Sequence, residues 1–183
     1  CVFMADPAWL EYDYTRAMLL GALAHGNPET ALCLGLGAGS LTQACLKFLP
    51  LEDVEVIELR PDVVRLAQEL LGLTDDPRLY LRIGDALELL GSAETADLVF
   101  VDLYTDVGPA AAHLAWSFLE ACQQRLNPGG WLIINQWTAT DCTPLGAALL
   151  RGLFHRHYWE IPVTEGNVVL LVPAGLEQDL DLD

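Results

Sequence analysis

The chain has 183 residues, 52% of them hydrophobic, and its formal net charge at pH 7 is -17. That length and composition predict one domain of ordinary size with a sizeable core. The acidic charge repels nucleic-acid phosphate and argues against a DNA or RNA partner, and the lack of an apolar run of about 18 residues argues against a membrane span.

Helical and extended patterns alternate along the chain. Apolar residues at helical spacing, bounded by Gly, Pro and Asn, predict helices over residues 12–24, 40–48, 62–71, 86–90, 113–126 and 144–154. Short apolar runs predict strands over residues 31–34, 54–58, 79–83, 96–101, 131–135, 158–163 and 167–172. A turn is expected at Asn127-Pro128-Gly129-Gly130, before the fifth strand.

Strands that alternate with helices predict a mainly parallel sheet covered on both faces. The last two strands flank Glu165-Gly166, which predicts an antiparallel hairpin at the sheet edge. We therefore expect an α/β fold, namely a Rossmann-like, doubly wound, mostly parallel seven-stranded sheet with a C-terminal antiparallel hairpin. Residues 1–175 are expected to form a single domain, followed by an acidic tail over residues 176–183.

Ligands of open α/β sheets bind beyond the carboxyl ends of the strands, so the residues that follow each strand are candidates for a site. The first strand leads into Gly35-Leu36-Gly37-Ala38-Gly39, whose glycines permit tight turns and a close approach of the ligand. A dinucleotide fingerprint would place its third glycine at Ser40, so the loop favours an adenosyl group over a pyrophosphate. A plain strand-to-helix turn is the alternative for the loop taken alone.

Three acids follow the next three strands. Glu58 lies about 20 residues beyond Gly37, the spacing at which such folds place a carboxylate against a ribose diol. Asp85 follows the third strand and could accept from an adenine amino group, and Asp102 ends the fourth strand, where it could bind an ammonium or take its proton. The alternatives are a solvated acid for Glu58, a helix N-cap for Asp85 and a structural Asp bonded to loop amides for Asp102.

The remaining features predict no second kind of site. The five cysteines are scattered, odd in number and without a Cys-x-x-Cys pair, which predicts neither zinc nor disulfides and fits a cytoplasmic protein. His155-Arg156-His157 is interpreted as a helix exit, so no metal is expected. We expect His113 to begin a helix, and Trp131, Trp137 and Trp159 to be core or dimer-contact aromatics.

Taken together, these runs resemble the spermidine synthases (polyamine aminopropyltransferases), which have a class I methyltransferase-like fold. The resemblance covers residues 12–172. It rests on residues 31–41, 54–64, 76–86, 101–102 with 108–110, and 126–130.

The resemblance implies the transfer of an aminopropyl group from decarboxylated S-adenosylmethionine to an amine such as putrescine. Glu58 would then hold the ribose and Asp85 the adenine, and Asp102 would activate the amine. The full set of implied contacts is Gly35, Gly37, Gly39, Glu58, Asp85, Ala86 and Asp102 for the adenosyl substrate, Asp102 and Tyr104 for catalysis, and Tyr14 and Asp106 for the acceptor. A cytoplasmic homodimer without a metal is also implied.

The chain departs from the family pattern in its amine-binding positions. Ala38 stands where the glycine loop usually carries an acid, and Thr105 stands where a second catalytic acid is usual, with Asp106 one residue further on. The usual Tyr-x-Glu motif ends here in Arg16, which predicts a cation where the ammonium should bind. The family's N-terminal β-hairpin domain is expected to be absent or truncated before Cys1, because the chain begins abruptly on a strand-like sequence.

Three hypotheses follow from this pattern. The first is a spermidine synthase-like transferase that uses decarboxylated S-adenosylmethionine. The second is an S-adenosylmethionine-dependent methyltransferase, in which Arg16 would face a carboxylate. The third is a nucleoside-binding homologue that does not catalyse. The sequence leaves the acceptor open in each case.

Overall fold

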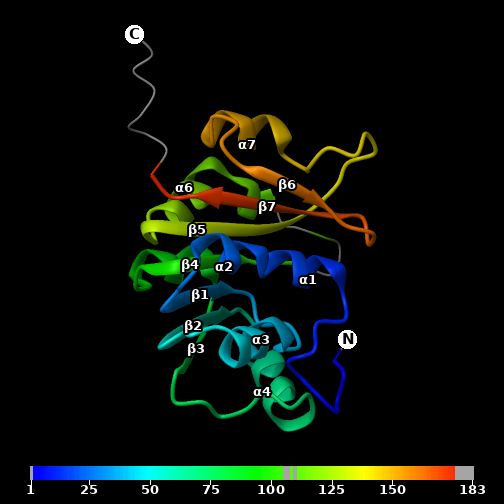
Figure 1. Cartoon of the computed structure of the whole chain (residues 1–183), viewed down its shortest axis with the longest axis vertical. Coiled ribbons are helices and arrows are strands. Elements are labelled where there is room, and N and C mark those ends of the chain that lie inside the picture. The colour runs from blue at the N-terminus through cyan, green and yellow to red at the C-terminus, as the bar shows by residue number, and fades with distance from the viewer. Residues whose placement is uncertain (1, 105–107, 109–110, 176–183) are drawn as a thin grey trace.

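The computed structural model describes residues 2–104, 108 and 111–175. Seven strands form one sheet in the order β3-β2-β1-β4-β5-β7-β6 (Figure 1). The first five strands run parallel, and β7 is antiparallel to both β5 and β6, so the expected fold is confirmed. The strands are β1 (Thr30–Leu34), β2 (Asp53–Glu58), β3 (Leu79–Ile83), β4 (Ala96–Val101), β5 (Leu126–Trp137), β6 (Trp159–Pro162) and β7 (Asn167–Pro173).

The central strands are apolar throughout because both faces of the sheet are covered. Along β4, Leu98 and Phe100 join the core on one face, and Val99 and Val101 join the core on the other. This alternation follows from the two-residue period of a strand, and it gives the sheet two separate hydrophobic layers.

Each layer is closed by its own helices (Figure 1). One face is covered by α1 (Asp13–Met18), α2 (Leu20–His25), α3 (Ser40–Phe48) and α4 (Pro61–Leu70). The other face is covered by α5 (Ala86–Leu89), α6 (Trp116–Gln123) and α7 (Ala147–Leu153). Within the described part of the chain, no helix has the length and apolar character needed to span a membrane.

The helix expected over residues 12–24 is instead two short helices. The Leu19 N–H donates to the Arg16 carbonyl, three residues back, so the chain makes a tighter turn there. Gly21 then brings α2 against the sheet, because a Cβ at this position would overlap the side chain of Ile133 in β5. The break and the missing side chain together let α1 and α2 lie close over β5.

The helix expected over residues 113–126 and the following turn are also wrong in part. A 3-10 turn over Ala111–Leu114 precedes α6, and β5 begins at Leu126, so the expected turn residues belong to the strand. The pairing register shifts between Ala96 and Leu98, and this irregularity admits Pro128 and Gly129 at the start of β5. The helix expected from residue 144 begins at Ala147, because Pro144 bridges to Thr138.

Replacement of Gly21 tests the close contact between α2 and the sheet. Gly21→Ala should lower the free energy of unfolding by about 1–3 kcal/mol, because the added methyl group overlaps Ile133 in a packed core. Urea unfolding followed by circular dichroism measures the change. Gly91→Ala is the matched control, since no described atom lies within 4 Å of a Cβ there. Equal stability of the two variants would contradict the packing.

Candidate active site

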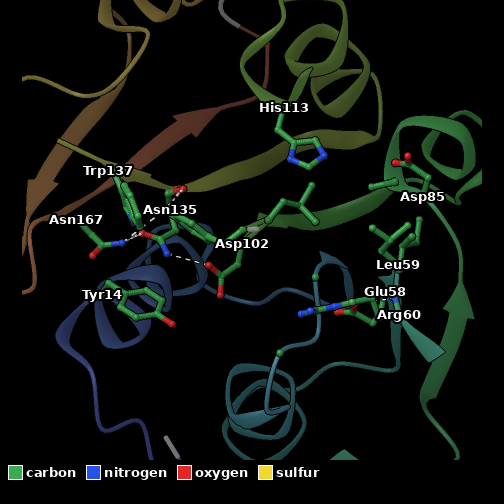
Figure 2. Close-up of a pocket in the computed structure, with 16 residues that line it drawn as sticks. Tyr14, Glu58, Leu59, Arg60, Asp85, Asp102, His113, Asn135, Trp137 and Asn167 are labelled. Carbon is green, nitrogen blue, oxygen red and sulfur yellow. Dashed lines mark hydrogen bonds between the residues drawn. The ribbon is translucent and has the colours of Figure 1, made fainter. Parts of the chain in front are cut away.

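A cavity of about 470 Å³ opens at the carboxyl ends of the parallel strands. It brings together residues at or just after the carboxyl ends of four different strands, as well as residues of α1, β5 and β7. Figure 2 shows Glu58 and Asp85 toward one end, Tyr14 and Asn167 toward the other, and Asp102 between them. The lining comprises Tyr14, Gly35, Gly37, Ile57, Glu58, Leu59, Arg60, Asp85, Ala86, Asp102, Leu103, Tyr104, His113, Asn135, Trp137 and Asn167.

The backbone conformation of the loop after β1 requires glycine. Gly35, Gly37 and Gly39 have φ values of 95°, 54° and 82°, in a region that side chains disfavour. A Cβ at Gly35 would also collide with the backbone oxygen of Asp102, whereas a Cβ at Gly37 would meet no described atom within 4 Å. The loop therefore passes close to the end of β4 and leaves a bare backbone surface toward the cavity.

Glu58 is fixed by backbone amides. Its side chain is buried, with Oε2 accepting from the Leu36 N–H at 3.0 Å and Oε1 accepting from the Arg60 N–H at 3.0 Å. The solvated acid that was the alternative interpretation is thus excluded. Glu58 ties the end of β2 to the glycine loop, and each of its oxygens keeps a further lone pair.

Asp85 caps α5. Its Oδ1 accepts from the Leu87 N–H at 2.9 Å, so the N-cap that was the alternative interpretation of Asp85 is present. Asp85 and Ala86 also line the cavity, so the cap and a contact with a ligand are compatible. His113 lies on the same side, and its Nδ1 is buried without a hydrogen-bond partner among the described residues.

Asp102 is held by a chain of two amides (Figure 2). Asn135 Nδ2 donates to Asp102 Oδ1 at 2.8 Å, and Asn167 Nδ2 donates to Asn135 Oδ1 at 2.8 Å. The Tyr104 hydroxyl donates to the Asn135 carbonyl at 3.1 Å. Among the described residues, the donor to Asp102 is therefore a side-chain amide, whereas the structural alternative supposed loop amides.

The Asp102 carboxyl has no cation beside it within the described residues. Burial raises its pKa, and the hydrogen bond from Asn135 opposes that rise. Burial and the nearby Asp102 charge also raise the pKa of Tyr14 and of Tyr104, so both phenols stay neutral. At this end of the cavity, Asp102 is thus the acid among the described residues, and neutral polar and aromatic groups surround it.

Arg16 does not place its charge in the cavity, and that expectation is wrong. Its Nε donates to the Leu10 carbonyl at 2.7 Å, and Nη1 donates to Asp13 Oδ1 at 3.1 Å. The guanidinium also lies 5.6 Å from the centre of the Trp9 ring. These contacts turn the cation away, so it opposes no ligand of the site.

A smaller cavity of about 110 Å³ adjoins the first and shares Tyr14, Gly37 and Asp102 with it. Glu11 and Asp102 supply its ionisable carboxyls, and no Lys, Arg or His lines it among the described residues. Ala38 and Gly39 line this cavity, so the loop position that lacks the family's usual acid lies beside it. Glu11 comes from the segment before α1, where its Oε2 accepts from Trp9 Nε1.

Sequence reasoning missed several lining residues, of which His113, Asn135, Trp137 and Asn167 carry ring or amide side chains. Asn135 ends an apolar run just as Asp102 does, so the same rule could have found it. Trp137 was expected to be a core or dimer-contact residue, but it lines the cavity with its ring tilted against that of Tyr104, the ring centres being 5.7 Å apart. His113 lies in a 3-10 turn and not at the start of a long helix. Asp106 lies outside the described residues.

Comparison with known families decides the relationship. The spermine/spermidine synthase domain matches residues 13–144. The chain belongs to the spermine/spermidine synthase family.

Curated relatives of this spermine/spermidine synthase family member are polyamine aminopropyltransferases. One from Nitrosomonas europaea is 33% identical over 150 residues, which is 78% of this chain and 46% of the relative. One from Enterobacter sp. is 32% identical over 127 residues, which is 66% of this chain and 44% of the relative. The chain thus spans slightly less than half the length of these relatives.

Solved structures share the fold. A probable spermidine synthase from Corynebacterium glutamicum has a TM-score of 0.76 at 23% identity, over 94% of this chain and 67% of that one. Human methyltransferase-like protein 13, in complex with SAH, has a TM-score of 0.77 at 24% identity, over 93% of this chain and 86% of that one. The fold alone therefore accommodates both members of this family and methyltransferases.

Neutralisation of Asp102 should stabilise the unliganded protein. The pKa of its carboxyl in the folded protein lies above the ordinary value of 3.8, so folding binds a proton more tightly and stability falls as pH rises between the two values. Asp102→Asn should therefore raise the thermal midpoint at pH 7, and the gain should shrink as pH approaches 3.8. Calorimetry across pH measures this difference. A destabilised variant at pH 7 would contradict the uncompensated charge.

Proposed function

We propose that this chain is a transferase domain that binds decarboxylated S-adenosylmethionine and passes its aminopropyl group to a small amine. The observation that carries the proposal is the half-buried Asp102 carboxyl beside the cavity, which has one amide donor and no cation among the described residues. Such a group gains most from a ligand that brings a positive charge or a proton. Family membership supports the same chemistry.

The end of the cavity near Glu58 suits the nucleoside. Glu58 is positioned to accept from the two ribose hydroxyls, and the bare backbone at Gly35 and Gly37 allows the ligand to approach closely. Asp85 can accept from the adenine amino group beside Ala86. The His113 Nδ1, which has no partner among the described residues, supports a base at this end, because a buried polar atom without a partner is costly.

The reaction would be a displacement at carbon. The acceptor enters as an ammonium, loses a proton toward Asp102, and the free amine attacks the carbon bound to the sulfonium. A carbon–nitrogen bond forms as the carbon–sulfur bond breaks, and the electron pair stays on sulfur in methylthioadenosine. The product is a secondary ammonium, and one proton is released to solvent. The domain contributes position, deprotonation and charge.

The environment of Asp102 suits this role. Burial raises the pKa of its carboxyl toward the working pH, which strengthens it as a base. Tyr14, Tyr104 and Trp137 line the cavity at this end and can hold a cation against their rings. Arg16 is turned away, so the amine meets no repelling charge from it.

The smaller cavity favours the decarboxylated substrate. Its ionisable groups are the carboxyls of Glu11 and Asp102, which attract an ammonium and repel a carboxylate. An aminopropyl arm carries only an ammonium, whereas the corresponding arm of unmodified S-adenosylmethionine carries an ammonium and a carboxylate. We propose that Glu11 supplies the negative charge that an acid at the position of Ala38 usually provides in this family.

A methyltransferase is the second candidate. The likeness to human methyltransferase-like protein 13 favours it at the level of the fold, and the nucleoside contacts would be the same. The two candidates differ in the arm of the sulfonium substrate, so binding preference separates them.

Ligand binding and turnover test the proposal together. Calorimetric titration should show tighter binding of decarboxylated S-adenosylmethionine than of S-adenosylmethionine, and turnover should release methylthioadenosine with putrescine, cadaverine or spermidine. Asp102→Asn should lower kcat roughly 100-fold or more while methylthioadenosine still binds. Preference for S-adenosylmethionine would favour the methyltransferase, and binding without turnover would favour a homologue that does not catalyse.

Glu11→Gln tests the charge of the smaller cavity. The variant should bind decarboxylated S-adenosylmethionine roughly threefold to fivefold more weakly, the range expected for a partly exposed ion pair. Its affinity for methylthioadenosine, which has no ammonium, should not change. Glu52→Gln is the control, because Glu52 is an exposed acid that lines neither cavity. Equal loss for both ligands would argue against a contact between Glu11 and the ammonium.

A further inference from the structure

We infer that Asn135 and Asn167 are positioning residues that fix which oxygen of Asp102 faces the ligand. The inference rests on the proposed function, in which Asp102 takes a proton from the amine. It concerns two amides on neighbouring strands, β5 and β7, that touch each other and of which only Asn135 touches Asp102. Sequence reasoning assigned a role to neither residue.

The strand register places the two amides together. In the antiparallel pair of β5 and β7, Trp137 lies opposite Asn167 and Asn135 lies opposite Val169. Side chains two residues apart share a face, so Asn135 and Asn167 are diagonal neighbours on the face that carries the cavity. A shift of one residue in this register would turn Asn167 to the other face.

The hydrogen bonds give the amides a direction. Asn135 Oδ1 accepts from Asn167 Nδ2, so the Asn135 amino group must point the other way, toward Asp102. A flipped Asn135 would place an oxygen against the carboxylate and an amino group against another amino group. Asn167 therefore prevents the flip, although it does not touch Asp102.

The consequence for Asp102 is a division between its two oxygens. Among the described residues, Oδ1 accepts from Asn135 and Oδ2 has no donor, so Oδ2 is the oxygen that would receive a proton from the ligand. The charge-assisted bond also favours the ionised form, against the effect of burial. The Tyr104 hydroxyl, which follows β4, donates a hydrogen bond to the Asn135 carbonyl and so ties this pair of amides to the segment after β4.

The phenols and the thiol whose pKa values respond to Asp102 do not supply this control. Tyr14 of α1, Tyr104 of its own loop and Cys33 of β1 sense its charge, and burial raises the pKa of each. All three remain neutral near pH 7, so they do not titrate together with the carboxyl. The amide chain is thus the polar element that distinguishes the two oxygens within the described residues.

Asn167→Asp is the sharpest test because it barely changes shape. The introduced carboxylate cannot donate to Asn135 Oδ1, but it can accept from the Asn135 amino group. The Asn135 amide should then turn its amino group away from Asp102 and toward this new carboxylate. We expect the Asp102 pKa to rise by at least about one unit, because the carboxyl loses one hydrogen bond to a charged group and gains a negatively charged neighbour. The acid limb of kcat/KM should move to higher pH by the same amount.

Two further measurements separate positioning from a general loss of structure. Asn135→Leu should raise the Asp102 pKa, and adding Asn167→Leu to it should change nothing more, because Asn167 acts only through Asn135. Asn127→Leu is the matched control, since Asn127 Nδ2 donates to Asp97 Oδ1 at 2.9 Å near the other end of β5. That variant should lower stability without moving the acid limb.

The Asp102 pKa is measured without substrate by carboxyl-carbon NMR, with the signal assigned by comparison with Asp102→Asn. This readout stands even if the wild-type protein turns over no amine, so failure of the inference and failure of the proposed function are distinct. A higher pKa in Asn167→Asp and Asn135→Leu, but not in Asn127→Leu, supports the inference. An unchanged Asp102 titration in folded Asn167→Asp, or additive shifts in the Leu pair, would overturn it.

Discussion

A half-buried carboxylate at the end of β4 constrains the whole site. Asp102 receives one hydrogen bond from Asn135 and has no cation beside it in the described residues. The free energy of such a group depends on what enters the cavity. Two neighbouring features hold Asp102 in place. The bare Gly35 backbone packs against the Asp102 carbonyl, and the apolar strand β4 fixes the position of Asp102 at the end of the sheet.

Much of the candidate site could be predicted from the sequence because its parts are local. The glycine loop, Glu58, Asp85 and Asp102 each follow an apolar strand directly, and parallel strands carry such residues to one edge of the sheet. The same reasoning predicts the sheet itself, since seven short apolar runs separated by turn residues can be recognised in the sequence. The contact between Glu58 and the Leu36 amide follows from that order but could not be foreseen in detail.

The missed parts depend on distant pairing. Asn167 reaches Asn135 only through the register of β5 and β7, which a single sequence does not specify. Trp137 enters the cavity because β5 runs longer than its apolar stretch, through Gln136. Arg16 was expected in the wrong place, since its direction is set by Leu10, Asp13 and Trp9 around it and not by its position in a motif.

The anchoring of Glu58 also bears on the cost of binding. Both of its oxygens already hold backbone N–H groups, at Leu36 and Arg60, so the glycine loop and the end of β2 are joined before a ligand arrives. A preorganised loop loses little conformational entropy on binding, and more of the contact energy remains as affinity. An adenosyl ligand would then meet a rigid receptor at its ribose, and selectivity among such ligands would fall to the groups around its sulfur.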